Sequence, residues 1–460
     1  MILAGATALS ACNMAPKYIR PAGEVPAELP RGWPYPAAAT DAPDISGVGW
    51  HDFFTDARLR QVIEAGLANN RDLRVAAANV LQARAQYRVQ RADLLPSTNA
   101  SAGATFTNNT TGAGAGPDAE IYSANLGLAS FELDLFGRIR NLNRAAQEQY
   151  FASEEAQRAT RISLIAEIAT AWLTLASDRD QLALAQETLK AFQQTLELTR
   201  AQFRIGVASE LAARQAETNY QGARNDIAAL NTRIAQDINA LNLLAGTAIP
   251  QDQLPAGLDD GRVTLDALPA DLSSTVLLAR PDVLQAEHQL IAANANIGAA
   301  RAAFFPKISL TAAFGTISTA LSGLFSSGSY VYNAAPTVAL PLFDGGRNAG
   351  NLAYAKATRQ AAVATYEKAV QSAFREVADA LATRGTIGEQ IAAQTARVEA
   401  AQVAAKLSDA RYRAGIDSFL TALDAQRTAY AARQQLQTTR LARASNLVEL
   451  YRSLGGGLKD

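Results

Sequence analysis

The chain repeats itself once, and this duplication limits the folds available to its 460 residues. Four short motifs recur in the same order at a spacing of about 210 residues, which is far longer than the repeat of a solenoid protein. The sequence therefore predicts two copies of one half-domain. The paired motifs are Arg71-Asp72-Leu73 with Pro281-Asp282-Val283, Leu95-Pro96 with Phe305-Pro306, Leu135-Phe136 with Leu342-Phe343, and Phe203-Arg204-Ile205-Gly206 with Tyr412-Arg413-Ala414-Gly415.

Each half is predicted to contain a helix, two strands and then a long helical hairpin. In the first repeat, residues 49–246, we expect a first helix over about 56–94 and strands near 97–107 and 120–134. In the second repeat, residues 273–454, the corresponding elements are a helix over about 273–304 and strands near 307–315 and 329–342. A proline-containing connector, 247–272, joins the repeats, and a short tail, 455–460, follows them.

The helices that follow the strands are unusually long and carry a seven-residue apolar spacing. In the first repeat the series is Ile168, Leu175, Leu182, Leu189, Leu196 and Phe203. The segment 139–203 would form roughly 100 Å of helix at 1.5 Å per residue. Ordinary globular helices are far shorter, so this pattern favours coiled-coil packing.

The strand segments alternate between apolar side chains and small or polar ones. In 307–315, Ile308, Leu310 and Phe314 share one face. This alternation fits a transmembrane β-barrel with a wet interior, and a half-buried soluble sheet would show the same pattern. Four strands cannot close a water-filled barrel, and open sheet edges do not survive in lipid. A membrane location would therefore require several chains, and three copies would supply twelve strands.

The N-terminal segment resembles the end of a bacterial lipoprotein signal peptide. Residues 1–12 are apolar and small, and Leu9-Ser10-Ala11-Cys12 matches a lipobox, in which the Cys becomes the acylated first residue of the mature protein. The alternative is a disordered apolar terminus with an incidental Cys. Residues 13–48 contain seven prolines, which exclude helices and central strands and predict an extended tether along a neighbouring surface.

Composition argues against several other functions. One Cys excludes a disulfide framework, and two widely separated His residues make a zinc site improbable. The net charge of −1 gives no basic footprint for nucleic acid. The sequence contains no Ser/His/Asp, metal or phosphate-binding constellation, so we predict neither an enzyme nor a cofactor. His51 and His288 are interpreted as helix-flanking polar residues without a role.

These features together resemble the TolC-like outer-membrane factors of tripartite efflux pumps, most closely the lipoprotein branch associated with resistance–nodulation–division (RND) pumps. The resemblance extends from Cys12 to about Leu454, and Ser130 departs from it where the family often has tryptophan. The matching motifs are Trp50-His51-Asp52-Phe53-Phe54-Thr55-Asp56, Phe131-Glu132-Leu133-Asp134-Leu135-Phe136-Gly137-Arg138, Arg280-Pro281-Asp282-Val283, Phe305-Pro306-Lys307-Ile308-Ser309-Leu310, Pro341-Leu342-Phe343-Asp344-Gly345-Gly346-Arg347, Arg411-Tyr412-Arg413-Ala414-Gly415 and Leu423-Asp424-Ala425-Gln426-Arg427.

The resemblance implies a homotrimer with a twelve-stranded outer-membrane β-barrel, four strands per chain, continued by a long α-helical barrel in the periplasm. Its implied function is passive export of drugs or other small toxic compounds. An inner-membrane RND pump, acting directly or through a periplasmic adaptor, would supply the energy and choose the substrate. Cys12 would carry acyl chains such as palmitate that anchor the N-terminus to outer-membrane lipid.

The resemblance also implies roles for several turns. Hairpin tips that dock the adaptor would include Arg204, Gly206, Ser209, Arg413, Gly415 and Ser418, although a glycine there could simply end a helix. Turns that join strand to helix would include Phe136, Gly137, Arg138, Phe343, Gly345 and Arg347. Asp409 and Asp417 are candidates for a carboxylate ring at the periplasmic gate, which would favour cations. The alternative for Asp409 is a solvated helix face.

Two other functions fit the same sequence. A TolC-like channel could serve type I protein secretion, and the neighbouring genes would distinguish this case from drug efflux. A soluble structural coiled coil would need no detergent for extraction and would form no pore.

Overall fold

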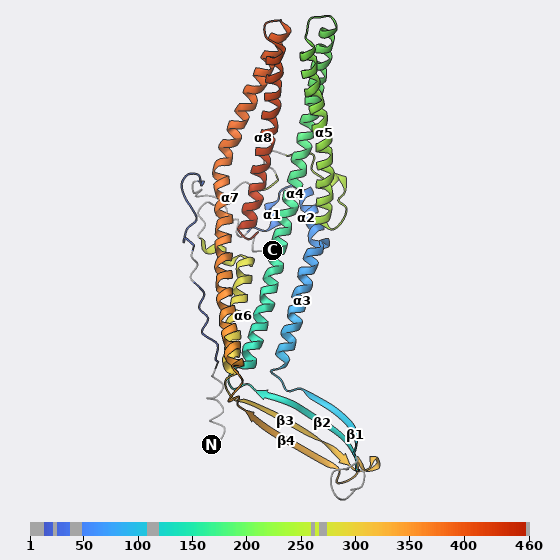
Figure 1. The fold of residues 1–460 in the computed structure, drawn as a ribbon, viewed down its shortest axis with the longest axis vertical. Coiled ribbons are helices and arrows are strands. Elements are labelled where there is room, and N and C mark those ends of the chain that lie inside the picture. The colour runs from blue at the N-terminus through green and yellow to red at the C-terminus, as the bar shows by residue number, and fades with distance from the viewer. Residues whose placement is uncertain are drawn as a thin grey trace. The chain divides into compact units, whose positions relative to one another are not determined.

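The computed structural model describes residues 13–21, 25–36, 48–107, 119–258, 263–265 and 274–456, which form two units. Unit 1 comprises Met1–Ala22, Ala78–Glu155 and Gln285–Lys368. Unit 2 comprises Gly23–Ala77, Ala156–Leu284 and Ala369–Asp460. Four of the helices contain residues of both units. Figure 1 shows the course of the chain through the helices and strands.

Unit 1 contains a single antiparallel sheet with the strand order β1-β2-β3-β4. The strands are β1 Thr98–Thr107, β2 Ala119–Leu133, β3 Lys307–Ser318 and β4 Tyr330–Ala339. Thr98 lies opposite Leu128, Tyr122 opposite Ser318, and Lys307 opposite Ala339. The second strand of the first repeat thus pairs with the first strand of the second. Among the described residues, β1 and β4 have a strand partner on one side only.

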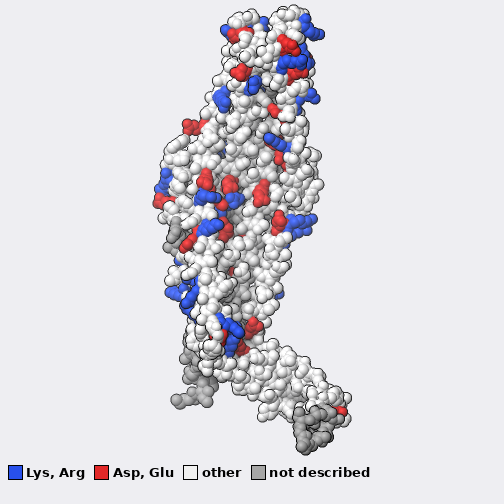
Figure 2. Space-filling view, in the orientation of Figure 1, with Lys and Arg blue, Asp and Glu red and all other residues white. Residues whose placement is uncertain are grey.

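Charged side chains occur only at the ends of these strands. They are Glu120 and Glu132 in β2 and Lys307 in β3, whereas β1 and β4 have none. In Figure 2 the visible surface of the strands is accordingly almost free of blue and red. Many apolar and aromatic side chains on this surface are exposed to solvent in the single chain, including Phe106, Phe314, Tyr330 and Tyr332. The strands therefore present a neutral surface along their middle sections.

The long helices of the two repeats match in length to within one residue. The helices before the strands, α3 Arg71–Ala92 and α6 Pro281–Ala302, each have 22 residues. The helices after the strands, α4 Arg138–Arg204 and α7 Arg347–Arg413, each have 67 residues. The return helices, α5 Glu210–Ala245 and α8 Phe419–Ser453, have 36 and 35 residues. The duplication seen in the sequence is therefore also a structural repeat.

Two helices that were predicted to be continuous are each divided into two elements in the structure. The predicted helix over 56–94 is divided into α2 Ala57–Asn69 and α3, because Asn70 has an extended backbone and its side chain accepts a hydrogen bond from the Leu73 amide at 2.9 Å. The predicted helix over 273–304 begins instead with the 3-10 helix η4 Ser274–Ala279, and α6 starts after Arg280. In the second repeat Pro281 is the first residue of α6, a position that suits proline, and it disfavours a helical conformation in the residue before it.

The main core lies in unit 2. It contains Phe53 of α1 (Trp50–Phe53), Leu59 of α2, Trp172 of α4 and Tyr451 of α8, all fully or almost fully buried. The ring of Phe53 stacks on that of Tyr451 with their centroids 4.1 Å apart. Among the described helices, α4 alone is apolar enough over 18 residues to cross a membrane, but half of that stretch is buried. This burial is what a core helix requires.

Candidate functional site

The long hairpins of unit 2 both reverse at a glycine. Gly206 and Gly415 have φ values of 77° and 74°, a left-handed conformation that costs glycine little. The Val207 amide donates to the Gln202 carbonyl at 2.9 Å, and the Ile416 amide donates to the Arg411 carbonyl at the same distance. These bonds satisfy carbonyl groups that a helix end would otherwise leave unpaired.

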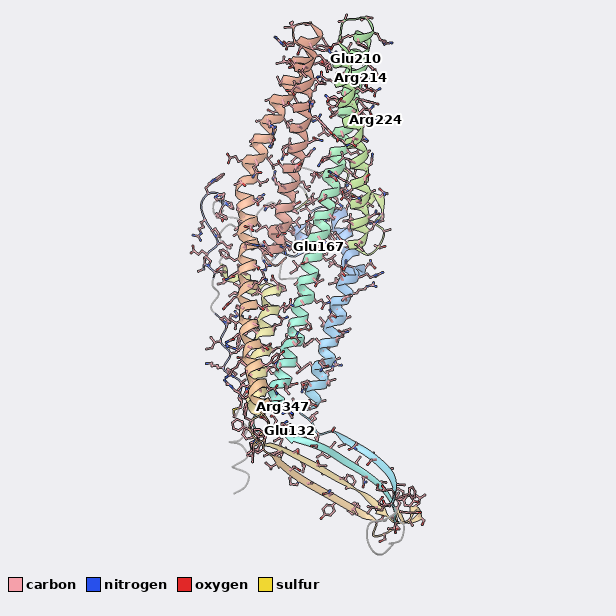
Figure 3. All side chains as sticks on the ribbon, in the orientation of Figure 1. Glu132, Glu167, Glu210, Arg214, Arg224 and Arg347 are labelled. Carbon is pink, nitrogen blue, oxygen red and sulfur yellow. The ribbon has the colours of Figure 1, made fainter. Side chains whose placement is uncertain are left out.

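The same turns start the return helices with matching caps. Ser209 accepts a hydrogen bond from the Ala212 amide, and Ser418 accepts one from the Thr421 amide, both at 3.2 Å. Figure 1 shows the two turns at the same end of unit 2. Glu210 and Arg214, labelled in Figure 3, lie on the first turns of α5 beside this tip. They form an ion pair at 3.4 Å.

Exposed apolar side chains flank both glycines, and of these only Ile205 belongs to a motif noted in the sequence. They are Ile205, Val207 and Leu211 at the first tip and Ile416 and Leu420 at the second, each more than half exposed. The signal in the sequence is an apolar residue directly before or after the turn glycine, as at Ile205, Val207 and Ile416, and another in the first turn of the return helix, as at Leu211 and Leu420. We define these five residues as the tip patch.

The two gate candidates are each paired with an arginine. Asp409 accepts from Arg413 at 2.9 Å, one helical turn away. Asp417 binds Arg411 through both oxygens at 2.7 and 2.9 Å, and this ion pair lowers the pKa of the Asp417 carboxyl. The single chain therefore places the carboxylates in two separate ion pairs.

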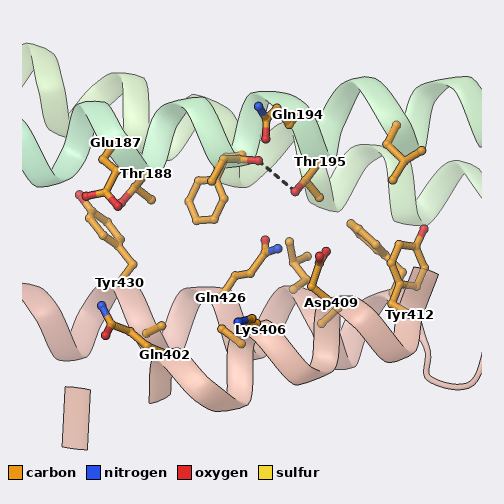
Figure 4. Close-up of a pocket in the computed structure, with 18 of the residues that line it drawn as sticks. Glu187, Thr188, Gln194, Thr195, Gln402, Lys406, Asp409, Tyr412, Gln426 and Tyr430 are labelled. Atoms are coloured by element: carbon orange, nitrogen blue, oxygen red, sulfur yellow. Dashed lines mark hydrogen bonds between the residues drawn. The ribbon is translucent and has the colours of Figure 1, made fainter. Parts of the chain in front are cut away.

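A cavity of about 550 Å³ lies between α4 on one side and α7 and α8 on the other, and Asp409 lines it together with Lys406, Thr195 and Gln426 (Figure 4). Three side-chain contacts join the hairpins beside this cavity. Tyr412 Oη donates to Gln202 at 2.6 Å, Tyr430 Oη donates to Asp226 at 3.0 Å, and Arg433 pairs with Glu187 at 2.7 Å. The hairpins are thus linked by polar contacts beside a small apolar cluster to which both hairpins contribute, including Leu196 of α4 and Phe419 of α8.

The strand-to-helix turns lie in unit 1, and the two repeats differ there. In the first, Phe136 stacks on Phe305 with centroids 4.7 Å apart, Gly137 has a φ of 78°, and Arg138 binds both oxygens of Glu132. In the second, Gly345 has a φ of 66°, but Phe343 is 94% exposed. Arg347, labelled in Figure 3 at this junction, is also exposed.

Residues 13–21, the first described part of the tether, lie along α6. Glu287 of α6 accepts from Tyr18 Oη at 2.9 Å and from Arg20 at 2.7 and 2.6 Å. Asn294 donates to the Pro16 carbonyl, and Asn141, in the first turn of α4, donates to the Asn13 side chain, both at 2.8 Å. We call residues 13–20 the strap. Cys12 itself lies outside the described residues.

His288 corrects one sequence interpretation. It lies in the interior of α6 rather than beside a helix end, and its Nδ1 contacts Glu148 of α4 at 2.7 Å. Across the described ranges, no three or more His, Cys, Asp or Glu side chains are grouped so that they could hold a metal ion. His288 therefore joins two helices of unit 1.

Comparison with known proteins gives a consistent result. The family model described as "Outer membrane efflux protein" matches residues 62–247 and 272–456. The probable efflux pump outer membrane protein TtgC of Pseudomonas putida is 45% identical over 455 residues, which are 98% of this chain and 93% of that protein. The cation efflux system protein CusC of Escherichia coli is 41% identical over 454 residues, which are 98% of this chain and 98% of that protein.

Solved structures show the same fold. A crystal structure of CusC superimposes with a TM-score of 0.87 at 40% identity and covers 97% of this chain and all of that one. The open state of the MtrE outer membrane channel of Neisseria gonorrhoeae gives 0.87 at 41% identity, with coverage of 97% and 99%. The predicted fold class is confirmed: four antiparallel strands per chain, long helices and an internal repeat, as in trimeric outer-membrane channels.

Proposed function

Because the chain belongs to the outer membrane efflux protein family and is the outer-membrane channel of a tripartite efflux system, we propose that three copies form one passive exit duct. In this assembly, twelve strands cross the outer membrane and the helical hairpins extend into the periplasm. The duct itself catalyses no reaction and needs no cofactor. Several relatives are named for efflux of toluene, solvents or cations, and we propose drugs or other small toxic compounds as the cargo here.

The observation that carries this proposal is the sheet of unit 1. Its four strands have two edges without a partner among the described residues, and β1 and β4 are exposed along their whole length. An open edge is not tolerated in hydrocarbon, and four strands are too few to enclose water. Pairing β4 of one copy with β1 of the next removes all edges, and closure with three copies yields a barrel of twelve strands.

The mass of the extracted protein tests this assembly. We expect membrane extraction to require detergent and native mass spectrometry to detect three chains per particle. A monomer that is released by salt alone would contradict the proposal.

The tip patch supports an adaptor as the partner at the hairpin end. Exposed apolar residues on a turn are unfavourable in water and suit a protein interface. We propose that a periplasmic adaptor covers the tip patch. An inner-membrane RND pump then connects to the channel either directly or through this adaptor. Energy and substrate choice belong to that pump.

The strap supports acylation of Cys12. Asn13, the first described residue, contacts Asn141 in the first turn of α4, which follows β2 by a short turn, so the described part of the strap begins close to the strands. Acyl chains on Cys12 would therefore enter the periplasmic leaflet beside the barrel, with about 0.8 kcal/mol for each buried methylene. Metabolic labelling with palmitate should mark the natural protein, and Cys12→Ser should abolish the label. Equal labelling of both would contradict this proposal.

Removal of the Glu287 carboxylate should release the strap. Glu287→Ala loses three charge-assisted or hydroxyl hydrogen bonds, and we discount their combined value to about 2 kcal/mol because Arg20 is half exposed. Trypsin cleavage after Lys17 should then become about 30-fold faster, since docking protects this site through its free energy. Glu399→Ala, at an exposed site of α7, is the control and should leave cleavage unchanged. Unaltered cleavage in Glu287→Ala would show that these bonds do not hold the strap.

Asp409 is proposed to line the periplasmic gate. Three copies of Asp409 near the trimer axis would favour cations, and Arg413 beside each carboxylate moderates that charge. In Asp409→Ala the arginines remain without the carboxylate, so the ratio of cation to anion permeability should fall severalfold in bilayer recordings. Asp379→Ala, which removes an exposed carboxylate near Arg375 on the same helix, should leave selectivity unchanged. Identical selectivity in all three proteins would remove Asp409 from the gate.

A further inference from the structure

The cavity between α4 on one side and α7 and α8 on the other is large enough for a small organic molecule. Its volume of about 550 Å³ falls within the range of small-molecule sites in proteins, about 300–1,000 Å³. All of its lining residues belong to unit 2. The chemistry of this lining indicates which class of molecule the cavity would take.

Two pairs of aromatic rings contribute to the lining. Phe192 of α4 and Tyr430 of α8 have ring centroids 6.4 Å apart. Tyr412 of α7 and Phe419 of α8 have ring centroids 5.4 Å apart. In Figure 4, Tyr430 and Tyr412 lie toward opposite ends of the cavity. Aromatic surface at each end favours a ligand with a flat aromatic body.

The charges of the lining do not balance. Three cations and two anions line the cavity: Lys406, Arg413, Arg433, Asp409 and Glu187. Asp409 binds Arg413 at 2.9 Å, and Glu187 binds Arg433 at 2.7 Å. Lys406 has no ion-pair partner in the part of the chain that the structure describes. One positive charge is therefore left for a ligand.

This charge lies between the aromatic pairs. Figure 4 shows Lys406 beside Gln426 and Asp409, in the middle section of the cavity. Across the cavity, Thr195 of α4 donates its hydroxyl proton to the Ala191 carbonyl at 3.0 Å, so its oxygen faces the cavity as an acceptor. A ligand with one acidic group on an aromatic ring would place its charge at Lys406 and its ring on the aromatic surface.

We propose that the cavity binds a small aromatic monoanion, such as an aryl sulfonate or an aryl carboxylate. Its acidic group pairs with Lys406, and its ring packs against Phe192 and Tyr430. A cationic ligand would be repelled by Lys406, and the second charge of a dianion would remain unpaired beside Asp409. Because α4 belongs to one hairpin and α7 and α8 to the other, the bound molecule contacts both hairpins and favours the arrangement in which they lie together.

Isothermal titration calorimetry with naphthalene-2-sulfonate tests the proposal on the full chain in lipid nanodiscs, with empty nanodiscs as the blank. We expect one site per chain and tighter binding than for the neutral 2-naphthalenemethanol. Lys406→Met should weaken sulfonate binding about fivefold and leave binding of the neutral compound unchanged, because it removes one charge at a solvent-accessible site. Lys190→Met, which removes an exposed lysine of α4 that does not line the cavity, should change neither.

A second variant tests the location of the site. Thr195→Trp places a large side chain in the cavity and should abolish binding of both compounds, while the circular dichroism spectrum stays that of the natural protein. Sulfonate binding that survives Thr195→Trp, or that is equal in the natural protein and Lys406→Met, would overturn the proposal. Heat of binding no greater than that of empty nanodiscs would also overturn it.

The contact with both hairpins has a separate readout, which rests on the passive duct proposed above. In bilayer recordings, naphthalene-2-sulfonate should shorten the open time of the natural channel, and Lys406→Met should require about fivefold more of the compound for the same effect. An open time that saturating sulfonate leaves unchanged would overturn the bridging of the hairpins. A channel that conducts no ions even without the compound would contradict the duct itself, while the calorimetric result would still decide on the binding site.

Discussion

Export is expected to be lost when Gly415 is replaced by valine, while the protein still reaches the outer membrane as a trimer. Gly415 has a φ of 74°, and a residue with a Cβ in this conformation is destabilised by about 1–2 kcal/mol. We expect the free variant turn to relax out of this conformation, so that docking of the adaptor has to restore it. The same amount is then subtracted from the docking free energy, which weakens binding roughly 5- to 30-fold per turn. The assembled trimer contains three such turns, so the loss of docking free energy applies at each of the three.

The measurement is drug susceptibility of a strain whose only channel is the variant. We expect susceptibility to match that of a strain without any channel, and Gly206→Val should behave alike because its φ is 77°. Gly222→Val is the matched control, since Gly222 also has open space around its Cβ position but lies inside α5 with ordinary helical geometry. Normal export by the Gly415 variant at normal protein level would refute the role of this turn.

The largest expected effect on stability comes from Arg280. Its side chain is almost completely buried in unit 2 and binds Asp282, Glu376 at 2.9 Å and the Ser453 carbonyl at 2.6 Å. Arg280→Met has a similar volume but leaves a buried carbonyl and part of two carboxylates without a donor. Breaking such a network costs about 3 kcal/mol, so the melting temperature should fall by roughly 5 °C or more.

Arg375→Met provides the comparison for Arg280. Arg375 is paired with Asp379 at 3.9 Å in the same unit, but both side chains are about three-quarters exposed. Exposed ion pairs contribute little to stability, so the melting temperature of the Arg375→Met variant should differ from that of the natural protein by no more than about 1 °C. Equal melting temperatures for the two variants would show that the Arg280 network does not stabilise unit 2.

Much of the fold follows from local sequence signals. Heptad spacing predicted the long hairpins because each apolar residue repeats on one helix face, and the left-handed glycines Gly206 and Gly415 end them where expected. Alternation predicted all four strands because side chains of a strand point to opposite faces in turn. β3, however, extends to Ser318, beyond the predicted limit at residue 315, since pairing with β2 continues there.

Other features depend on contacts between distant segments and could not be predicted. The break at Asn70 needs the carbonyl of Leu244, 174 residues away, which accepts a hydrogen bond from the Asn70 side chain at 2.9 Å. The strap depends on Glu287, whose importance is visible only when Tyr18 and Arg20 are placed beside it. Arg413 and Arg411 lie near the gate candidates Asp409 and Asp417 in the sequence. The sequence does not show, however, that these side chains form ion pairs.

Single-channel recording from the purified trimer in a planar lipid bilayer shows whether the channel is a passive pore. We expect discrete, cation-preferring conductance steps in the absence of any pump or energy source, because the duct is a passive pore lined by protein. Detergent-solubilised protein that inserts into the bilayer as a trimer and conducts no ions under any voltage would contradict it.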